Sequence, residues 1–346
     1  RMKELGINAC LPGYSGMVPH DAKQRLNLDV ADPGKWNDYK RPAFLQPTDK
    51  RFAEIASLYY KEQEKLFGKA NFYSMDPFHE GGNARGVDLQ AAGKAIMGAM
   101  KAVNPKAVWV AQAWGACPYP DMIRNLKSGD MLVLDLYSEN RPQWGDPEST
   151  WYRKDGFNGH DWAYCMLLNF GGNVGLYGKI QHVIEEYYMA RKSKFASTLK
   201  GVGLTMEAIE NNPVMYELVS ELPWRSSEFS WKEWLHDYVE ARYGNINNDK
   251  AQEAWLLLAK SVYGAPAKLT EQGCHESVLC ARPALDAYQV SSWSEMEEFY
   301  DPDDVIRAAR LMVEASHEVK ANTNFRYDLV DITRQAIAEQ ARLVYD

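Results

Sequence analysis

The sequence predicts an α/β fold of the (β/α)8 TIM-barrel type, incomplete at its N-terminus and followed by an all-α domain. Three observations lead to this prediction. Short apolar segments alternate with helical patterns in the first part of the chain, as in right-handed βαβ units of a parallel sheet. Polar or aromatic side chains follow these segments, where barrel enzymes place their catalytic groups. The strand patterns stop near Pro223, so we predict the barrel over residues 1–224 and the helical domain over residues 225–346.

Six strands are predicted from near-continuous apolar runs, which are typical of parallel strands covered by helices on both faces. A complete barrel has eight strands, so part of it is missing or unrecognised. A doubly wound open sheet is the alternative, although no glycine-rich phosphate motif supports it. The predicted strands cover residues 7–14, a run that starts at Asn71, 107–114, 131–136, 161–170 and 202–209. The polar or aromatic side chains at their ends are Tyr14, Glu80, Trp114, Glu139, Asn169 and Glu207.

Amphipathic patterns predict the helices between and after these strands. One helix follows Thr48, and another begins at Asp301 and Pro302, an N-cap with proline at the first helical position. Residues 19–47 have no strong periodicity, and Trp36 in that segment is either the packing anchor of a loop or the wall of a pocket. The remaining predicted helices cover residues 88–103, 120–127, 178–193, 231–243, 250–263 and 325–345.

The composition excludes several classes of partner. A net charge of -8 argues against nucleic acid and against an anionic membrane surface. No apolar run is long enough to span a bilayer, so we expect no membrane insertion. The opening residues resemble the last turn of a helix that Gly6 ends, and we therefore expect a fragment whose start is lost. Neither the compartment nor the oligomeric state is predicted from such a chain.

The five cysteines lie at scattered positions, with neither a disulfide framework nor the paired spacing of a zinc site. Cys10 and Cys165 lie in apolar runs and are predicted to be small core residues. Cys274 and Cys280 are close enough in sequence to pair, but we do not predict a disulfide between them.

Glu80 is the first candidate catalytic residue. It closes an apolar run that begins at Asn71, and Pro77 should stop regular strand pairing just before it. Gly81 and Gly82 then permit a sharp exit from the strand. Glu80 therefore lies just past a strand end, although a solvated carboxylate in a surface loop would have the same sequence pattern.

Glu207 is the second candidate, since it also lies at the end of a predicted strand. Glu80 and Glu207 are far apart in sequence, and only a closed sheet would bring them together. Two carboxylic residues across a sugar-sized gap are what glycoside hydrolysis requires, one protonated and the other ionised. Nearby aromatic residues are either sugar platforms or ordinary core and interface residues. These aromatic residues are Trp36, Trp114, Trp144, Trp162 and Trp224.

Other chemistries have weaker support. Asp76, His79 and Glu80 are ligand types within five positions, but no second histidine-rich cluster accompanies them, so we predict neither a metal nor another cofactor. The GxSxG motif of serine hydrolases does not occur in the sequence.

Six motifs are distinctive when they are taken together and in order. They are AVWVAQAW at 107–114, LVLDLY at 132–137, WAYCMLLNFGGN at 162–173, GVGLTMEAIENNPVMY at 201–216, ARYG at 241–244 and ARPAL at 281–285. These motifs resemble those of the α-N-acetylglucosaminidases of glycoside hydrolase family 89 and occur in the order that the family has. The similarity extends over nearly the whole chain. The resemblance implies an α/β barrel followed by a helical domain, and a retaining exo-glycosidase that releases terminal α-linked N-acetylglucosamine from a glycan. It also implies an exported protein.

Carried over by position, the resemblance makes Glu80 the general acid/base and Glu207 the nucleophile. Two alternatives stay open: a catalytically silent carbohydrate-binding protein, and a glycosidase of other hexose specificity. Turnover of an aryl α-N-acetylglucosaminide separates the first of these from the enzyme. The residues that fall where the family lines its sugar pocket are Trp36, His79, Trp114, Asn169, Phe170, Asn173 and His275.

The chain departs from the family pattern at several places. His79 stands before the acid/base where the family usually has asparagine, and Met206 stands before the nucleophile where proline is common. We do not find the family's small N-terminal domain, its first barrel strand or a pocket loop with aromatic and histidine residues. The helical domain is also truncated relative to the family.

Overall fold

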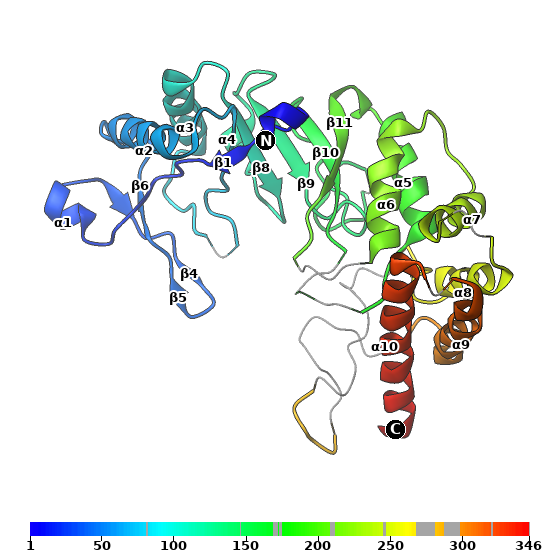
Figure 1. Cartoon of the computed structure of the whole chain (residues 1–346). Coiled ribbons are helices and arrows are strands. Elements are labelled where there is room, and N and C mark those ends of the chain that lie inside the picture. Colours follow the sequence, from blue (N-terminus) through cyan, green and yellow to red (C-terminus); the bar gives the residue numbers. More distant parts are fainter. Residues whose placement is uncertain are drawn as a thin grey trace. The chain divides into compact units, whose positions relative to one another are not determined.

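The computed structural model of the chain is shown in Figure 1. The chain forms two compact units. The first unit contains residues 1–136, 142–164 and 194–201, and the second contains residues 137–141, 165–193 and 202–346. The described ranges are residues 1–80, 82–145, 147–168, 172, 175–207, 212–244, 247–267, 281–286, 298–319 and 321–345.

A six-stranded sheet forms the scaffold, with the strand order β1-β7-β8-β9-β10-β11. Neighbouring strands from β1 to β10 pair in parallel. Strands and helices alternate along the chain, which gives the α/β architecture that the sequence predicts. The strands of this sheet are β1 (Cys10–Pro12), β7 (Phe72–Ser74), β8 (Val108–Ala113), β9 (Met131–Asp135), β10 (Asp161–Met166) and β11 (Leu199–Leu204).

All six predicted strands exist and occur in the predicted sequence order. The two strands at the ends of the sheet, β1 and β11, deviate most from the prediction. β1 is short and mostly exposed, because it pairs on one side only. The prediction that Cys10 is a core residue is therefore wrong, since its side chain is exposed, whereas Cys165 is buried in β10 as predicted.

The segment that lacked periodicity forms two small antiparallel sheets in the first unit. In one of them β6 is the central strand and is completely buried, which anchors the segment to the core. The other is a hairpin of two-residue strands that projects from the rest of its unit in Figure 1. The strands of the two sheets are β2 (Met17–Val18), β3 (Val30–Ala31), β6 (Ala43–Leu45), β4 (Lys35–Trp36) and β5 (Tyr39–Lys40).

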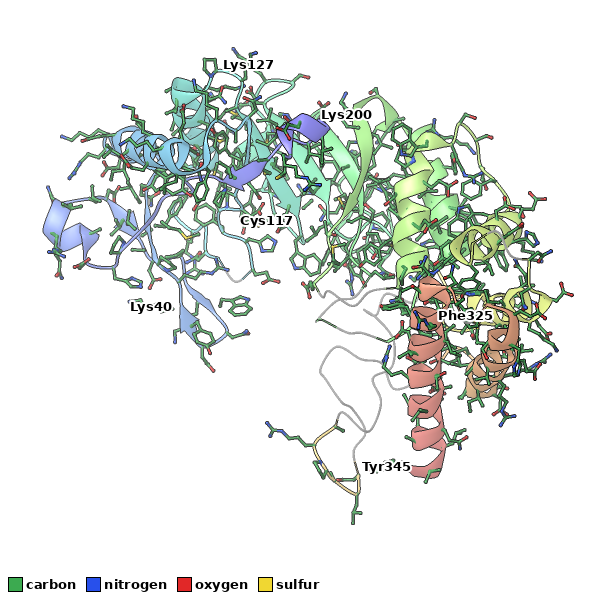
Figure 2. The ribbon with its side chains drawn as sticks, viewed as in Figure 1. Lys40, Cys117, Lys127, Lys200, Phe325 and Tyr345 are labelled. Atoms are coloured by element: carbon green, nitrogen blue, oxygen red, sulfur yellow. The ribbon has the colours of Figure 1, made fainter. Side chains whose placement is uncertain are left out.

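Within the first unit, β1, β7, β8 and β9 pair in parallel, so their carboxyl ends lie on the same side of the sheet. Cys117, which follows β8, lies at one end of the strands, while Lys127 and Lys200, which precede or open later strands, lie at the other (Figure 2). Trp109 and Val133 in the central strands are fully or nearly fully buried, so the sheet carries the core of this unit.

The predicted helices are all present, with boundaries that differ by a few residues. Asp88 caps α3, since its carboxylate accepts a hydrogen bond from the Ala91 amide at 3.0 Å. In the first unit the helices are α1 (Ala22–Leu26), α2 (Phe52–Phe67), α3 (Leu89–Val103) and α4 (Pro120–Ile123), with the 3-10 turns η1 (Lys3–Leu5) and η3 (Ala196–Thr198). In the second unit they are α5 (Ile180–Lys192), α6 (Pro213–Glu221), η4 (Leu222–Trp224), α7 (Trp231–Arg242), α8 (Asp249–Lys260), α9 (Pro302–Val319) and α10 (Thr323–Tyr345).

After α6, every helix or strand that the structure describes is a helix, as the sequence predicts, and turns and loops connect these helices. Helices α8 and α9 pack together, as do α9 and α10 (Figure 1). Arg242 of α7 makes a two-pronged ion pair with Asp328 of α10, at 2.6 and 2.7 Å, and the Tyr243 hydroxyl donates to the same carboxylate. The domain boundary at residue 224 stays a prediction. None of the helices in the described ranges is long and apolar enough to cross a membrane.

Two glycines of α3 give a matched test of the packing. A Cβ atom on Gly93 would lie 1.9 Å from the Met122 carbonyl oxygen, whereas a Cβ on Gly98 would meet nothing within 4 Å. We expect Gly93→Ala to lower the free energy of unfolding by about 1–3 kcal/mol or more, because the two helices must separate. Gly98→Ala should raise it by about 0.5–1 kcal/mol, since alanine favours the helix. Urea unfolding followed by circular dichroism measures both, and equal stability of the two variants would contradict the packing.

Candidate active site

The loop after β7 presents Glu80 at the surface through a tight left-handed turn. Phe78 and Glu80 both have positive φ angles, 66° and 38°, which are unfavourable for residues other than glycine. Phe78 is buried, and its ring packs against Phe44 of β6 with centroids 4.7 Å apart. The turn therefore anchors one aromatic side chain in the core and leaves the carboxylate two residues later exposed.

The hairpin of β4 and β5 supplies a second wall. Its two-residue loop begins with Asn37 at a φ angle of 50°, as tight hairpin turns require. In this register Trp36 lies opposite Tyr39, and the two rings stack with centroids 6.3 Å apart. Both rings are accessible, with exposed fractions of 49% for Trp36 and 72% for Tyr39. An exposed aromatic pair on a projecting hairpin is well suited to contact a sugar ring.

The hairpin and the loop meet at Glu80. The Trp36 indole Nε1 donates a hydrogen bond to Glu80 Oε2 at 3.0 Å. The Arg41 guanidinium Nη2 donates to two main-chain carbonyl oxygens, those of His79 and Glu80. Beside these contacts lies a cavity of about 360 Å³ that is wide open to solvent, with a volume within the range of small-molecule sites. The cavity is lined by Trp36, Tyr39, Lys40, Arg41, Pro42, His79 and Glu80.

His79 contributes a neutral imidazole to this cavity. Burial lowers the pKa of His79, the Glu80 carboxylate raises it in part, and the Arg41 guanidinium lowers it further. The ring is therefore uncharged at neutral pH, with one nitrogen able to donate and the other to accept. Its Nε2 atom is buried and has no hydrogen-bond partner among the described residues. A ligand hydroxyl could be such a partner.

Asp76, in contrast, belongs to the scaffold. Its Oδ1 accepts a hydrogen bond from the Gln112 amide of β8 at 2.7 Å, which ties the loop to the neighbouring strand. Burial raises the pKa of Asp76 to about 7, and that hydrogen bond opposes the rise. In the ranges that the structure covers, no three His, Cys, Asp or Glu side chains are grouped to hold a metal ion.

Glu139 lies in the second unit, and its carboxylate, like that of Asp76, accepts hydrogen bonds from main-chain amides. Its side chain is 2% exposed, and Oε1 accepts hydrogen bonds from the Leu167 and Leu168 amides at 2.9 and 2.8 Å. Leu168 has a φ angle of 61°, so this carboxylate holds a left-handed turn just after β10. Burial raises the pKa of Glu139 to about 8, although the main-chain amides of Leu168, Glu139 and Leu167 and the Lys179 ammonium oppose the rise.

The other predicted site residues divide into two groups. Trp114 follows β8 in the first unit, is half-buried, and packs edge-on against Trp151 with centroids 4.6 Å apart. Glu207 lies in the second unit, exposed and three residues after β11. Glu80 and Glu207 belong to different units, so their separation stays a prediction. Four residues lie outside the described ranges, namely Asn169, Phe170, Asn173 and His275.

Among the tryptophans considered as sugar platforms, Trp144 and Trp162 are buried and stack on each other at 5.9 Å. They are therefore core residues. Trp224 is largely exposed in the second unit.

Comparison with known proteins decides the family. Residues 1–226 match the model of the α-N-acetylglucosaminidase (NAGLU) TIM-barrel domain, and residues 234–346 match that of the C-terminal domain of the same proteins. The chain belongs to the α-N-acetylglucosaminidase family. The fold class and the family resemblance drawn from the sequence are thereby confirmed.

The family members most informative for this chain are human and bacterial. Human α-N-acetylglucosaminidase is 33% identical over 364 aligned positions, which include all of this chain and 47% of the human protein. The family 89 glycoside hydrolase of Clostridium perfringens is 32% identical, with a TM-score of 0.88 for its complex with PUGNAc, covering 98% of this chain and 38% of that one. A variant of that hydrolase with two glutamate-to-glutamine substitutions has been solved with its substrate GlcNAc-α-1,4-galactose, with a TM-score of 0.87. The chain thus spans about half the length of the human relative, and less of the bacterial one.

Sequence reasoning missed four of the residues that line this candidate site, and Tyr39 and Arg41 are the two among them with side-chain contacts to the other site residues. The signal for Tyr39 was present, since Asn37 and Asp38 form a two-residue turn between short alternating segments. Arg41 carried no signal, because an arginine that binds main-chain carbonyls has no characteristic spacing in sequence.

Replacing Glu139 by glutamine should reduce the pH dependence of stability. The pKa of an unperturbed glutamate is 4.5, whereas burial raises the pKa of Glu139 to about 8 in the folded protein. The stability that this group contributes is therefore fully present below pH 4.5 and is lost as the pH rises towards 8. The glutamine oxygen can accept the same two amide hydrogen bonds and does not titrate.

The measurement is urea unfolding of wild type and Glu139→Gln at about pH 5 and about pH 8. The wild type should lose more free energy of unfolding across this range, at about 1.4 kcal/mol for each unit by which the pKa is raised. Glu54→Gln, on the exposed face of α2, is the matched control. If wild type and Glu139→Gln lose the same free energy, the environment assigned to Glu139 is wrong.

Proposed function

We propose that this chain is the catalytic part of a retaining exo-glycosidase that hydrolyses terminal α-linked N-acetylglucosamine. Glu207 is the nucleophile and Glu80 the general acid/base. The observation that carries the proposal is the hydrogen bond from the Trp36 indole to the Glu80 carboxylate, because it directs a strand-end glutamate into a cavity of ligand size. The family assignment supplies the substrate class.

The bacterial relative supports the choice of two glutamates and of the sugar. Its substrate complex was obtained with two glutamates replaced by glutamine, and the substrate is GlcNAc-α-1,4-galactose. Another complex contains a 2-acetamido-1,2-dideoxy sugar mimic. We transfer to this chain the sugar with its 2-acetamido group and the use of two glutamates.

The stereochemistry of the substrate requires a nucleophile from the protein. In an α-linked N-acetylglucosaminide the 2-acetamido group is cis to the leaving oxygen, so it cannot attack the anomeric carbon from the opposite face. Substrate assistance is therefore excluded, so a retaining mechanism requires a carboxylate of the protein to form the covalent intermediate. Glu207 has this role in the proposal.

The reaction then proceeds in two displacements. In the first, the Glu207 carboxylate attacks C1, the bond between C1 and the glycosidic oxygen breaks, and Glu80 gives its proton to that oxygen. In the second, Glu80 removes a proton from water, the water oxygen attacks C1, and the Glu207 carboxylate is released. Two inversions at C1 give a product with the α configuration of the substrate. The two carboxyl groups should lie about 5–5.5 Å apart for this mechanism.

The remaining site residues are proposed to bind the sugar. Trp36 and His79 line the cavity beside Glu80, and the neutral imidazole offers Nε2 to a sugar hydroxyl. Trp114 follows the next strand and presents a half-buried ring. The family resemblance adds Asn169, Phe170, Asn173 and His275 to the pocket.

Glutamate variants of the complete protein test the assignment. Wild type should release the α-anomer first, as followed by NMR, since two displacements retain configuration. Glu207→Ala should lose about 10³-fold or more in kcat and regain turnover with azide, which gives the β-glycosyl azide from the vacated face. Glu80→Ala should lose about 10²–10⁴-fold on natural glycosides, and much less on aryl glycosides whose leaving groups need little protonation.

An initial β-anomer would reject the retaining mechanism. If Glu80→Ala impaired both kinds of substrate equally, Glu80 would hold the sugar rather than protonate the leaving group. A wild-type protein without turnover of any α-N-acetylglucosaminide would favour the catalytically silent alternative.

A further inference from the structure

We propose that Arg41 is a positioning residue for Glu80, and that the Trp36 hydrogen bond determines which oxygen of Glu80 carries the catalytic proton. The inference rests on the proposed acid/base role of Glu80. It adds a function for a side chain that need not touch the substrate, because Arg41 acts through the main chain of the loop.

The contacts of Arg41 are specific to the turn that presents Glu80. A single guanidinium nitrogen donates to the carbonyl oxygens of two successive residues, His79 and Glu80. Glu80 has a φ angle of 38°, and in this left-handed turn its carbonyl oxygen and that of His79 both face the Arg41 guanidinium. The left-handed conformation is unfavourable for a glutamate, and the two hydrogen bonds from Arg41 help to stabilise it.

Arg41 is itself held in place by the segment between the hairpin and β6. Its amide donates to the Gly34 carbonyl oxygen at 3.1 Å, which fixes the main chain at the base of the hairpin. Pro42 follows directly, and then the completely buried β6 begins. The guanidinium is therefore attached to a part of the first unit that is anchored in the core.

The segment 33–44 holds the loop on both sides of Glu80. Before the glutamate, the Phe78 ring packs on Phe44. After it, the Asn83 amide donates to the Pro33 carbonyl oxygen at 2.8 Å. Arg41 binds the main chain between these two contacts, and among the described residues its guanidinium is the group that holds the carbonyl of Glu80 itself.

The side chain of Glu80 is oriented by the hydrogen bond from Trp36. An indole N–H can only donate, so Glu80 Oε2 is an acceptor in the contact with Trp36. When Glu80 is protonated, this contact favours the proton on Oε1, because the unprotonated carbonyl oxygen is the stronger acceptor for the indole N–H. Arg41 orients the main chain and Trp36 orients the carboxyl group, so together they define the direction of proton transfer.

The dependence of rate on the leaving group tests this role. Complete proteins carrying Arg41→Ala, Arg41→Lys or the control Lys35→Ala are assayed on aryl α-N-acetylglucosaminides with good and poor leaving groups. The quantity compared is kcat/KM, which reports the step in which the leaving group departs. Lys35→Ala removes one positive charge from the same hairpin, from a residue that does not line the cavity.

We expect Arg41→Ala to lower kcat/KM by about 10–10²-fold for the poor leaving group and by less than about 3-fold for the good one, because a misplaced acid matters only where protonation is needed. Arg41→Lys should show the same selectivity with a smaller loss, and it serves as the test variant if Arg41→Ala does not fold. Lys35→Ala should match wild type on both substrates.

An equal loss on both substrates, or no loss, would overturn the positioning role. The proposed function is judged separately by Glu80→Ala. If that variant shows no selectivity for the leaving group, Glu80 is not the acid; if it does and Arg41→Ala does not, only the inference about Arg41 fails.

Discussion

The hydrogen bond between the Trp36 indole and the Glu80 carboxylate is the interaction on which the function proposed for this structure depends. It joins two separate elements of the first unit. One is the loop after β7 of the parallel sheet, which carries Glu80, and the other is the β4–β5 hairpin, which is not part of that sheet. Parallel β/α architecture alone places Glu80 only within a loop, where side chains have many orientations. The hairpin and Arg41 select one of them. The sheet therefore determines where Glu80 lies, and the segment 33–44 determines how its side chain is oriented.

Glu80 and Glu139 show how environment separates two carboxylates that both follow strands of the same sheet. Glu80 is exposed, lines a cavity and accepts a hydrogen bond from one side chain. Glu139 is buried, and its Oε1 holds two main-chain amides at the end of β10. Burial without full compensation raises the pKa of Glu139 to about 8, because its Oε2 has no hydrogen-bond partner in the described part of the chain. Its contacts are those of a structural residue, whereas Glu80 lines a cavity, which is why Glu80 is the residue proposed as the acid.

The sequence predicted the elements whose pattern is long and buried. β8, β9 and β10 were found because runs such as residues 107–114 are apolar without interruption. β1 and β11 were placed less well, since strands at the ends of a sheet are partly exposed and lose that pattern. The two-residue strands β4 and β5 are too short to be found by periodicity. The turn residues Asn37 and Asp38 were the only sequence signal for this hairpin, so Trp36 was recognised but its partner Tyr39 was not.

The candidate site was predictable to a similar extent. Strand-end position and the family resemblance identified Glu80, His79 and Trp36, and the structure brings these three together around one cavity. The contact from Arg41 to two main-chain carbonyls depends on a left-handed turn, and no local sequence rule predicts a glutamate in that conformation. Tertiary contacts with Phe44 and Arg41 hold the turn, and such contacts are not encoded in any single stretch of sequence.

The most direct test of the role of Glu80 is a crystal structure of the complete protein, with Glu80 and Glu207 both replaced by glutamine, bound to GlcNAc-α-1,4-galactose. We expect the Glu80→Gln amide to lie about 2.6–3.2 Å from the glycosidic oxygen. The Trp36 indole should still donate to the other atom of that side chain, and Arg41 should still bind the two carbonyls. A glycosidic oxygen out of hydrogen-bond reach of position 80, or a Trp36 indole turned away from it, would contradict the assignment of Glu80 as the acid.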